Sequence, residues 1–223
     1  MYDEVILYLK IASIVMSVLI AGFICRLGSG RGRRSPQLLF WALAWVIVAL
    51  RVLVQLLSPS KPPDEVLQSD LLGYFLGDVL TVLHDLLWFV GLAIVLEFST
   101  AKRVYFPIAY MAVHSIIVGT LYFSLNNTIL AAIETTMIAH PLLLFVLFWY
   151  FYVTAQETKR WGTSLVAASF LLWALDYIVF GVPYFGIGIG LAGALGWIIG
   201  FVFRTMILIG FIFMVIEQEE LDY

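Results

Sequence analysis

The segment from Gly73 to Glu97 is apolar over most of its length, yet it contains Asp78, His84 and Asp85. It is long enough to cross the hydrocarbon core of a bilayer, which takes about 20 helical residues. An ionisable side chain at that depth costs about 2.5–3.5 kcal/mol on insertion scales. Asp78 and Asp85 are two helical turns apart and therefore lie on one helix face. The segment predicts a membrane helix with a functional polar face.

The composition of the whole chain places it in a membrane. The sequence has 223 residues, of which 63% are hydrophobic and 12% charged, and its mean hydropathy is +1.03. A soluble domain carries about 25% charged residues. Strands that alternate apolar and polar residues, as in an outer-membrane barrel, are not evident. The one cysteine, Cys25, rules out an internal disulfide. We therefore predict an all-α, polytopic integral membrane protein.

The apolar segments predict seven transmembrane helices in one bundle, and this single domain covers residues 1–223. The acidic start of the chain favours a retained first helix over a cleaved signal peptide. The loops between the helices are short, so we expect the function to lie inside the bundle, at its ends or with a partner. The predicted helices cover residues 5–26, 37–57, 71–98, 105–125, 128–154, 164–180 and 191–216.

Basic residues predict the orientation of the bundle, because they accumulate in cytoplasmic loops. Only Lys61 lies in the loops on one side, whereas the other side carries Arg26, Arg31, Arg33, Arg34, Lys102, Arg103, Lys159 and Arg160. This asymmetry puts the N-terminus outside and the C-terminus in the cytosol. We expect a multi-pass protein of the inner or plasma membrane.

Polar residues within the predicted helices gather at two depths, by a rise of 1.5 Å per residue. The outer layer, a predicted site for a ligand or a proton, consists of Lys10, Arg51, Asp78, Glu134 and Asp176. The middle layer, a predicted coupling or relay site, consists of His84, Asp85, His114, His140 and Arg204. Buried charges require partners. The outer layer is therefore either an ion network that aligns the helices or a site for a ligand.

Within the middle layer we expect Asp85 to pair with Arg204, and His84 to point toward a different neighbour. The three histidines His84, His114 and His140 are candidate metal ligands, although no spacing typical of a metal motif occurs. Two of them on facing helices would suit a haem. Retinal is rejected, because the last predicted helix has no lysine for a Schiff base.

These observations favour a stand-alone seven-helix sensor, receptor-like, that detects a small ligand, a cation or a proton through an outward-facing polar site. In topology the chain resembles the seven-helix sensor regions that precede cytosolic kinase domains in prokaryotes. Three alternatives stay open: a small-solute or proton-coupled transporter, a histidine-liganded haem or metal redox protein, and a structural subunit of a membrane complex. No catalytic residue is predicted, and a role without catalysis is favoured.

The expected partners follow from the same surfaces. The lipid bilayer surrounds the bundle, and the acidic C-terminal residues offer a contact for a cytosolic or membrane protein. Gly196 and Gly200 form a small-residue face for a neighbouring helix or a second copy of the chain. No nucleic acid is expected as a partner.

Overall fold

The computed structural model describes residues 2–28, 35–57, 71–95, 100–125, 138–187 and 190–220. These residues form seven α-helices and one short π-helix, with no strand among them. The α-helices are α1 (Tyr2–Gly28), α2 (Pro36–Leu57), α3 (Leu71–Val95), α4 (Thr100–Gly119), α6 (His140–Thr158), α7 (Trp161–Ile187) and α8 (Gly190–Glu220), and the π-helix η2 (Thr120–Ser124) continues α4. The all-α prediction is confirmed.

Five of these helices are long and apolar enough to cross a membrane, which supports a multi-pass membrane protein. They contain the stretches Glu4–Gly28, Pro36–Leu57, Phe75–Val95, Trp161–Ile178 and Leu195–Glu217. The surface agrees, because large apolar side chains on all seven α-helices are exposed, such as Val15, Leu39, Ile116 and Leu142. A lipid environment removes the penalty for such a surface. The seven-span arrangement and its orientation stay predictions.

The predicted helix over residues 128–154 begins later within the described residues. Its N-terminal part, including Glu134, lies outside them, and α6 starts at His140 after a π-helical turn at Ile138 and Ala139. Pro141 lacks the backbone N–H that an α-helix would use to bond the preceding turn, so the regular pattern starts here. At its other end α6 reaches Thr158, where Lys159 takes a left-handed conformation with φ 57° and stops the helix.

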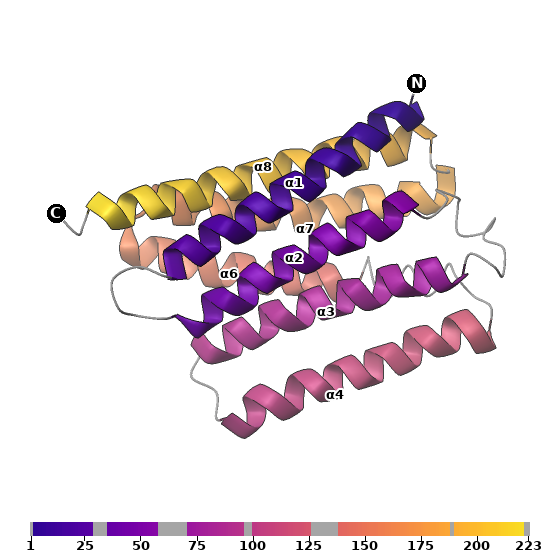
Figure 1. Ribbon diagram of the computed structural model, residues 1–223, viewed down its shortest axis with the longest axis horizontal. Helices are drawn as coiled ribbons and strands as arrows, with labels where there is room; N and C mark the ends of the chain where they lie inside the picture. The colour runs from indigo at the N-terminus through magenta and orange to yellow at the C-terminus, as the bar shows by residue number, and fades with distance from the viewer. Residues whose placement is uncertain are drawn as a thin grey trace.

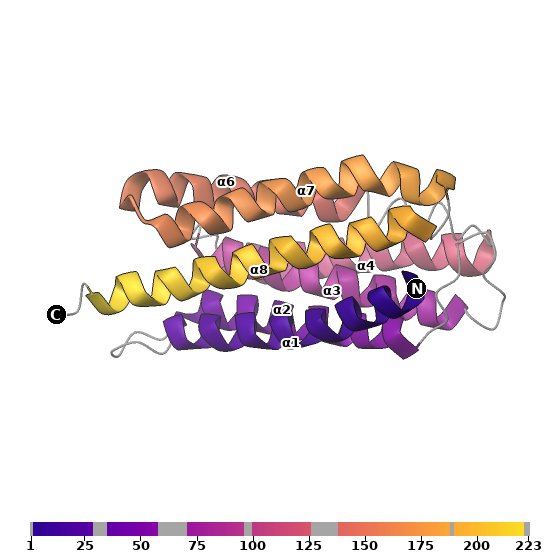
Figure 2. The ribbon, with the colours of Figure 1, turned by 90° about the horizontal axis from the view of Figure 1, so that it is seen from above.

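Most helices pack on their neighbours in the chain, and the first helix packs on the last. Helices α3, α2, α1, α8, α7 and α6 lie side by side in that sequence, and α4 packs on the outer side of α3 (Figures 1 and 2). Within the described residues, α6 and α3 touch over a short stretch, and this contact closes the ring. The ring therefore has one weakly packed junction, between α3 and α6.

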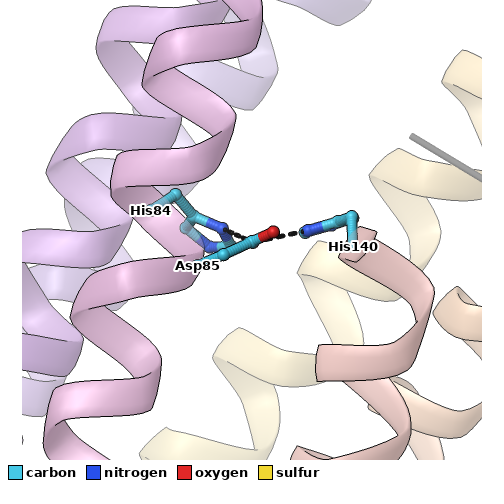
Figure 3. Close-up of side chains that lie close together, drawn as sticks. All are labelled: His84, Asp85 and His140. Atoms are coloured by element: carbon cyan, nitrogen blue, oxygen red, sulfur yellow. Dashed lines mark hydrogen bonds and ion pairs between the residues drawn. The ribbon is translucent and has the colours of Figure 1, made fainter. Parts of the chain in front are cut away.

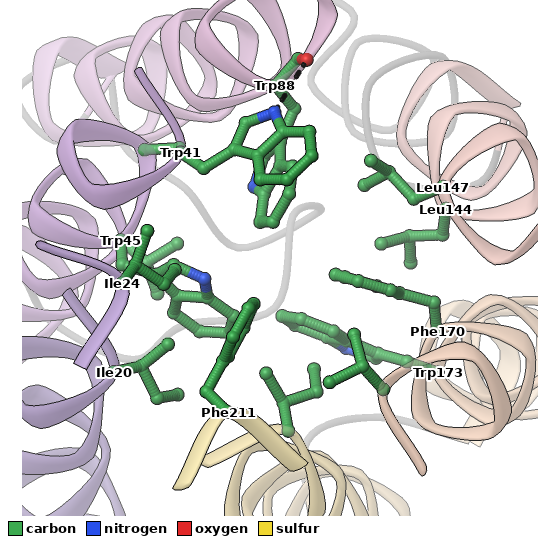
Figure 4. Close-up of a cluster of buried hydrophobic side chains, with 14 of the residues drawn as sticks. Ile20, Ile24, Trp41, Trp45, Trp88, Leu144, Leu147, Phe170, Trp173 and Phe211 are labelled. Carbon is green, nitrogen blue, oxygen red and sulfur yellow. Dashed lines mark hydrogen bonds between the residues drawn. The ribbon is translucent and has the colours of Figure 1, made fainter. Parts of the chain in front are cut away.

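Aromatic side chains fill the interior of the ring. Trp45, Trp88, Phe170, Trp173 and Phe211 are almost completely buried and project inward from four helices, α2, α3, α7 and α8 (Figure 4). The rings of Trp45 and Trp173 stack at a centroid distance of 5.9 Å. These apolar side chains pack closely, but in a membrane they gain no hydrophobic free energy from contacting other helices instead of lipid. Shape complementarity and polar contacts therefore position the helices.

Helices α7 and α8 make the closest backbone contact. A Cβ atom added to Gly162 would come within 2.6 Å of both the Gly210 carbonyl oxygen and the Met214 nitrogen. The Glu217 carboxylate of α8 also accepts hydrogen bonds from the first backbone N–H groups of α7, at 2.9 Å from Trp161 and 3.3 Å from Gly162. A carboxylate suits this place, because it pairs otherwise unsatisfied N–H groups at a helix start.

Within the described residues, the predicted close-packing face at Gly196 and Gly200 makes no close helix contact. A Cβ atom at Gly196 would meet no atom within 4 Å, and one at Gly200 would meet only the Arg204 side chain at 4.0 Å. The α7–α8 contact uses Gly162 and Gly210, because these glycines face each other across the helix pair. A contact of Gly196 and Gly200 with a second copy stays a prediction.

Candidate functional site

The α3–α6 junction is formed by one carboxylate between two imidazoles. His140, the first residue of α6, lies with its Nδ1 2.7 Å from Asp85 Oδ1 on α3. The Nδ1 atom of His84 lies 3.0 Å from the same oxygen (Figure 3). All three side chains are buried. We call the Asp85–His140 contact the α3–α6 bridge, because it joins two helices that otherwise touch little.

The hydrogen bonds determine which nitrogen of His84 carries the hydrogen. The Trp88 indole N–H donates to His84 Nε2 at 3.0 Å. An indole nitrogen can only donate, so Nε2 must present its lone pair and the hydrogen lies on Nδ1. This hydrogen then points at the Asp85 carboxylate. Trp88, His84, Asp85 and His140 thus form one continuous chain of hydrogen bonds.

This chain of hydrogen bonds bears on the predicted metal and haem site. The ligand atoms of His84, Asp85 and His140 all lie within 4.8 Å of one another, as in a metal centre. A metal at Nδ1 of His84, however, would move the hydrogen to Nε2, where it would face the Trp88 N–H. A haem iron would have to lie between the two imidazoles, where the Asp85 oxygen is. The arrangement as it stands is a hydrogen-bond relay, and a metal or a haem at these residues stays a prediction.

His114, the third candidate ligand, does not join this group. It lies on α4, where its ring stacks on Tyr110 at 5.7 Å. Helix α4 packs on α3, and the cluster of His84, Asp85 and His140 does not include His114. Sequence depth alone cannot show this, because it gives the height of a residue and not the position of its helix.

The predicted Asp85–Arg204 pair is wrong. Arg204 on α8 donates to Ser13 Oγ on α1 at 3.0 Å, and its guanidinium lies over the rings of Trp173 and Trp197, at 5.4 Å and 5.8 Å. Two imidazoles already occupy Asp85. The prediction that His84 points away from Asp85 is also wrong, because its ring turns back along α3 to the neighbouring carboxylate.

Arg204 instead connects the two predicted layers. The Arg204 guanidinium interacts electrostatically with Tyr177, Arg51 and Asp176. Arg51 in turn interacts electrostatically with the imidazole of His84. Residues assigned to an outer and a middle layer therefore form one electrostatic group, because the helices of the bundle bring residues of different depths close together.

Two other members of the outer layer have hydrogen-bond partners of their own, and one of them, Lys10, shares the Trp197 ring with Arg204. Asp78 accepts a hydrogen bond from the Tyr122 hydroxyl at 2.7 Å, in a small cluster between α3 and the end of α4. Lys10 on α1 donates to the backbone oxygen of Gln55 on α2 at 2.8 Å, and its ammonium lies 5.7 Å from the Trp197 ring. Both side chains are buried. Glu134, the fifth member, lies outside the described residues.

Within the part of the chain that the structure describes, five buried polar atoms near the middle of the ring have no hydrogen-bond partner. They are Trp45 Nε1, Arg51 Nε, His140 Nε2, Asp176 Oδ1 and Arg204 Nε. We call their residues the central polar cluster. Sequence reasoning selected four of them as site residues and missed Trp45, which it treated as one aromatic residue among many.

Three members of the cluster, Trp45, His140 and Arg204, contact Trp173. Its ring contacts Trp45 and the guanidinium of Arg204, and the His140 ring meets it edge-on at 5.9 Å. Asp176 follows Trp173 by three residues and therefore shares its helix face. Each unpartnered buried group costs about 1–3 kcal/mol. Three of the five residues therefore contact one aromatic ring, and a fourth, Asp176, shares its helix face.

Comparisons of the chain with protein-family models, with curated proteins and with solved structures find no match.

Proposed function

We propose that this protein is a receptor-like membrane sensor and that a small polar ligand binds at the central polar cluster. The observation that carries the proposal is the set of five buried, unpartnered polar atoms contributed by α2, α6, α7 and α8. A ligand that completes their hydrogen bonds would be favoured over lipid or apolar solutes, because only polar partners remove the cost of burial.

His140 connects the cluster to the helix arrangement. Its Nδ1 forms the α3–α6 bridge with Asp85, while its Nε2 has no partner among the described residues. A ligand that bonds Nε2 acts on the same ring that joins the two helices. Hydrogen bonds along such a chain polarise one another, so occupancy at one end alters the strength of the bond at the other.

The helix packing indicates which helices would move when the strength of the α3–α6 bridge changes. Helices α1, α2 and α3 pack in series, as do α6, α7 and α8, and the two groups meet at α1–α8 and at the α3–α6 bridge. A ligand that donates to Nε2 makes the Nδ1–H group a stronger donor to Asp85, so the strengthened bridge would draw α6 toward α3, while the α7–α8 backbone contact at Gly162 and Gly210 holds that pair together. The cytosolic ends of α3 and α6 are then the output of the sensor.

Distance measurements between spin labels test this proposal. Cysteines at Ile94 and Glu157, in a Cys25→Ser background, place one label near the end of α3 and one near the end of α6. A panel of small carboxylates, amines and polyols is added to the protein in nanodiscs. We expect at least one compound to change the α3–α6 distance, and His140→Phe to abolish the change.

A second label pair provides the control. Labels at Trp161 and Ile216, both exposed, report on α7 and α8, whose distance should stay constant. A compound that binds with no change in the α3–α6 distance would contradict the sensor proposal. Flux of a bound compound across proteoliposomes would support the transporter alternative instead.

A further inference from the structure

The chemistry of the five unpartnered atoms identifies a class of ligand, and this step rests on the proposed function. Three of the atoms are hydrogen-bond donors: Trp45 Nε1, Arg51 Nε and Arg204 Nε. Indole and guanidinium nitrogens cannot accept a hydrogen bond. A ligand must therefore offer acceptor oxygens to this part of the cluster. Guanidinium groups pair best with a planar carboxylate.

The other two atoms are acceptors. The hydrogen of His140 is on Nδ1, where it faces the Asp85 carboxylate, so the neutral ring presents a lone pair at Nε2. Asp176 presents Oδ1. A ligand must offer N–H or O–H groups to this part of the cluster, and an ammonium group, with three hydrogens, can serve both atoms.

Donors and acceptors come from different helices. Trp45 and Arg51 lie on α2 and Arg204 on α8, whereas His140 lies on α6 and Asp176 on α7. In the ring, α2 lies across from α6 and α7, and Figure 4 shows Trp45 and Trp173 approaching from these opposite sides. A ligand that bridges the two sides needs its acceptor and donor groups at different ends.

The charges limit the ligand further. Asp85 on α3 bonds His140, Arg51 on α2 interacts electrostatically with His84 and with Arg204 on α8, and Asp176 on α7 interacts with Arg204. Two guanidinium groups and two carboxylates balance one another when both imidazoles are neutral. A buried ligand with net charge would disturb this balance at a high cost in a low-dielectric interior. A zwitterion would preserve it.

We infer that the ligand is a small amino acid in its zwitterionic form. Its carboxylate accepts hydrogen bonds from Trp45, Arg51 and Arg204, and its ammonium donates to His140 Nε2 and Asp176 Oδ1. This assignment gives every unpartnered atom of the cluster a partner of the right kind. Glycine and alanine are the members of the class that add the least volume to a packed interior.

Four probe compounds test the inference by thermal unfolding and tryptophan fluorescence of the full chain in detergent. Glycine and alanine carry both groups, acetate only the carboxylate, and methylamine only the ammonium. Glycine betaine has the same charges as glycine, but its methylated nitrogen cannot donate a hydrogen bond. We expect saturable binding of glycine or alanine, and binding at least tenfold weaker for acetate, methylamine and betaine.

Two conservative variants connect the binding to the cluster. Asp176→Asn keeps the shape of the side chain and removes its charge, and Trp45→Phe removes one donor. Each should weaken glycine or alanine binding by tenfold or more. Trp161→Phe, at a side chain that is 79% exposed, should leave binding unchanged. If a variant does not fold, its binding data are not used. The comparison of glycine with betaine on the unmodified chain then tests the inference.

The outcomes separate this inference from the proposed function. Acetate or betaine that binds as tightly as glycine would overturn the zwitterion. A different polar compound that changes the α3–α6 distance, with no binding of glycine or alanine, would also overturn it but leave the sensor intact. No change of that distance with any bound compound would contradict the sensor itself.

Discussion

At the scale of single residues, tryptophan side chains fix the polar groups of this protein. Trp88 determines the tautomer of His84, and Trp173 contacts His140 and Arg204. In a lipid-surrounded bundle water is scarce, so a buried indole N–H without a partner, such as that of Trp45, is costly. These residues therefore act through hydrogen bonds as much as through packing.

Replacing Trp88 with Phe should release His84 from its tautomer. The Nε2 atom would lose its donor and remain buried, which costs about 1–3 kcal/mol of stability. We expect a lower midpoint of thermal unfolding and imidazole ¹⁵N chemical shifts that move from a single Nδ1–H form toward a mixture. The exposed Trp161, changed to Phe, should alter neither quantity. Unchanged shifts in Trp88→Phe would contradict the assigned tautomer.

Gly91 and Gly77 on α3 offer a matched pair of substitutions. A Cβ atom at Gly91 would collide with the ring of Trp41, whose indole N–H donates to the Trp88 carbonyl at 3.3 Å. Gly91→Ala should therefore lower stability by about 1–3 kcal/mol, as expected for overpacking. Gly77→Ala meets no atom within 4 Å and should be neutral or stabilising. Equal unfolding midpoints for the two variants would be evidence against the packing of Trp41 on α3.

At the scale of helices, α7 and α8 form the tightest pair and α3 and α6 the loosest. The first pair is joined by backbone contact at Gly162 and by the Glu217 carboxylate, and the second mainly by the α3–α6 bridge. Small residues allow close approach of helices in membranes, where apolar side chains gain little from leaving lipid. The position of glycine thus decides which pair is rigid.

Gly162→Ala should separate α7 from α8. Its Cβ atom would meet backbone atoms at 2.6 Å, which cannot rotate away as a side chain can. We expect a loss of stability of about 1–3 kcal/mol, together with a longer distance between labels at Trp161 and Ile216. Gly196→Ala on α8 is the control, since nothing lies within 4 Å of its added atom. A larger effect at Gly196 would indicate that this face is occupied by another chain.

At the scale of the whole molecule, the orientation in the membrane is a prediction from the basic loops. Cys25 is exposed near the end of α1 that the prediction places in the cytosol. A membrane-impermeant maleimide added to intact cells should leave Cys25 unmodified, and should label it after the membrane is opened. A cysteine at Leu57, at the opposite end of α2, should react in intact cells in a Cys25→Ser background. The reverse pattern would invert the topology.

The sequence by itself determined the membrane environment, the helical class and most of the residues of interest. Hydropathy and segment length are properties of local sequence, and they identify spans without any knowledge of packing. The same reasoning selected Arg51, His140, Asp176 and Arg204, because an ionisable side chain in an apolar helix is conspicuous at any position.

Only the tertiary structure decided which of these groups meet. Depth along a helix says nothing of which helices are neighbours or how side chains turn, so the sequence favoured an Asp85–Arg204 pair where the structure has Asp85 between two histidines. It also placed His114 with the other histidines, although α4 packs outside the ring. Partner choice depends on distances of a few ångströms, and these are set by the packing of all the helices together.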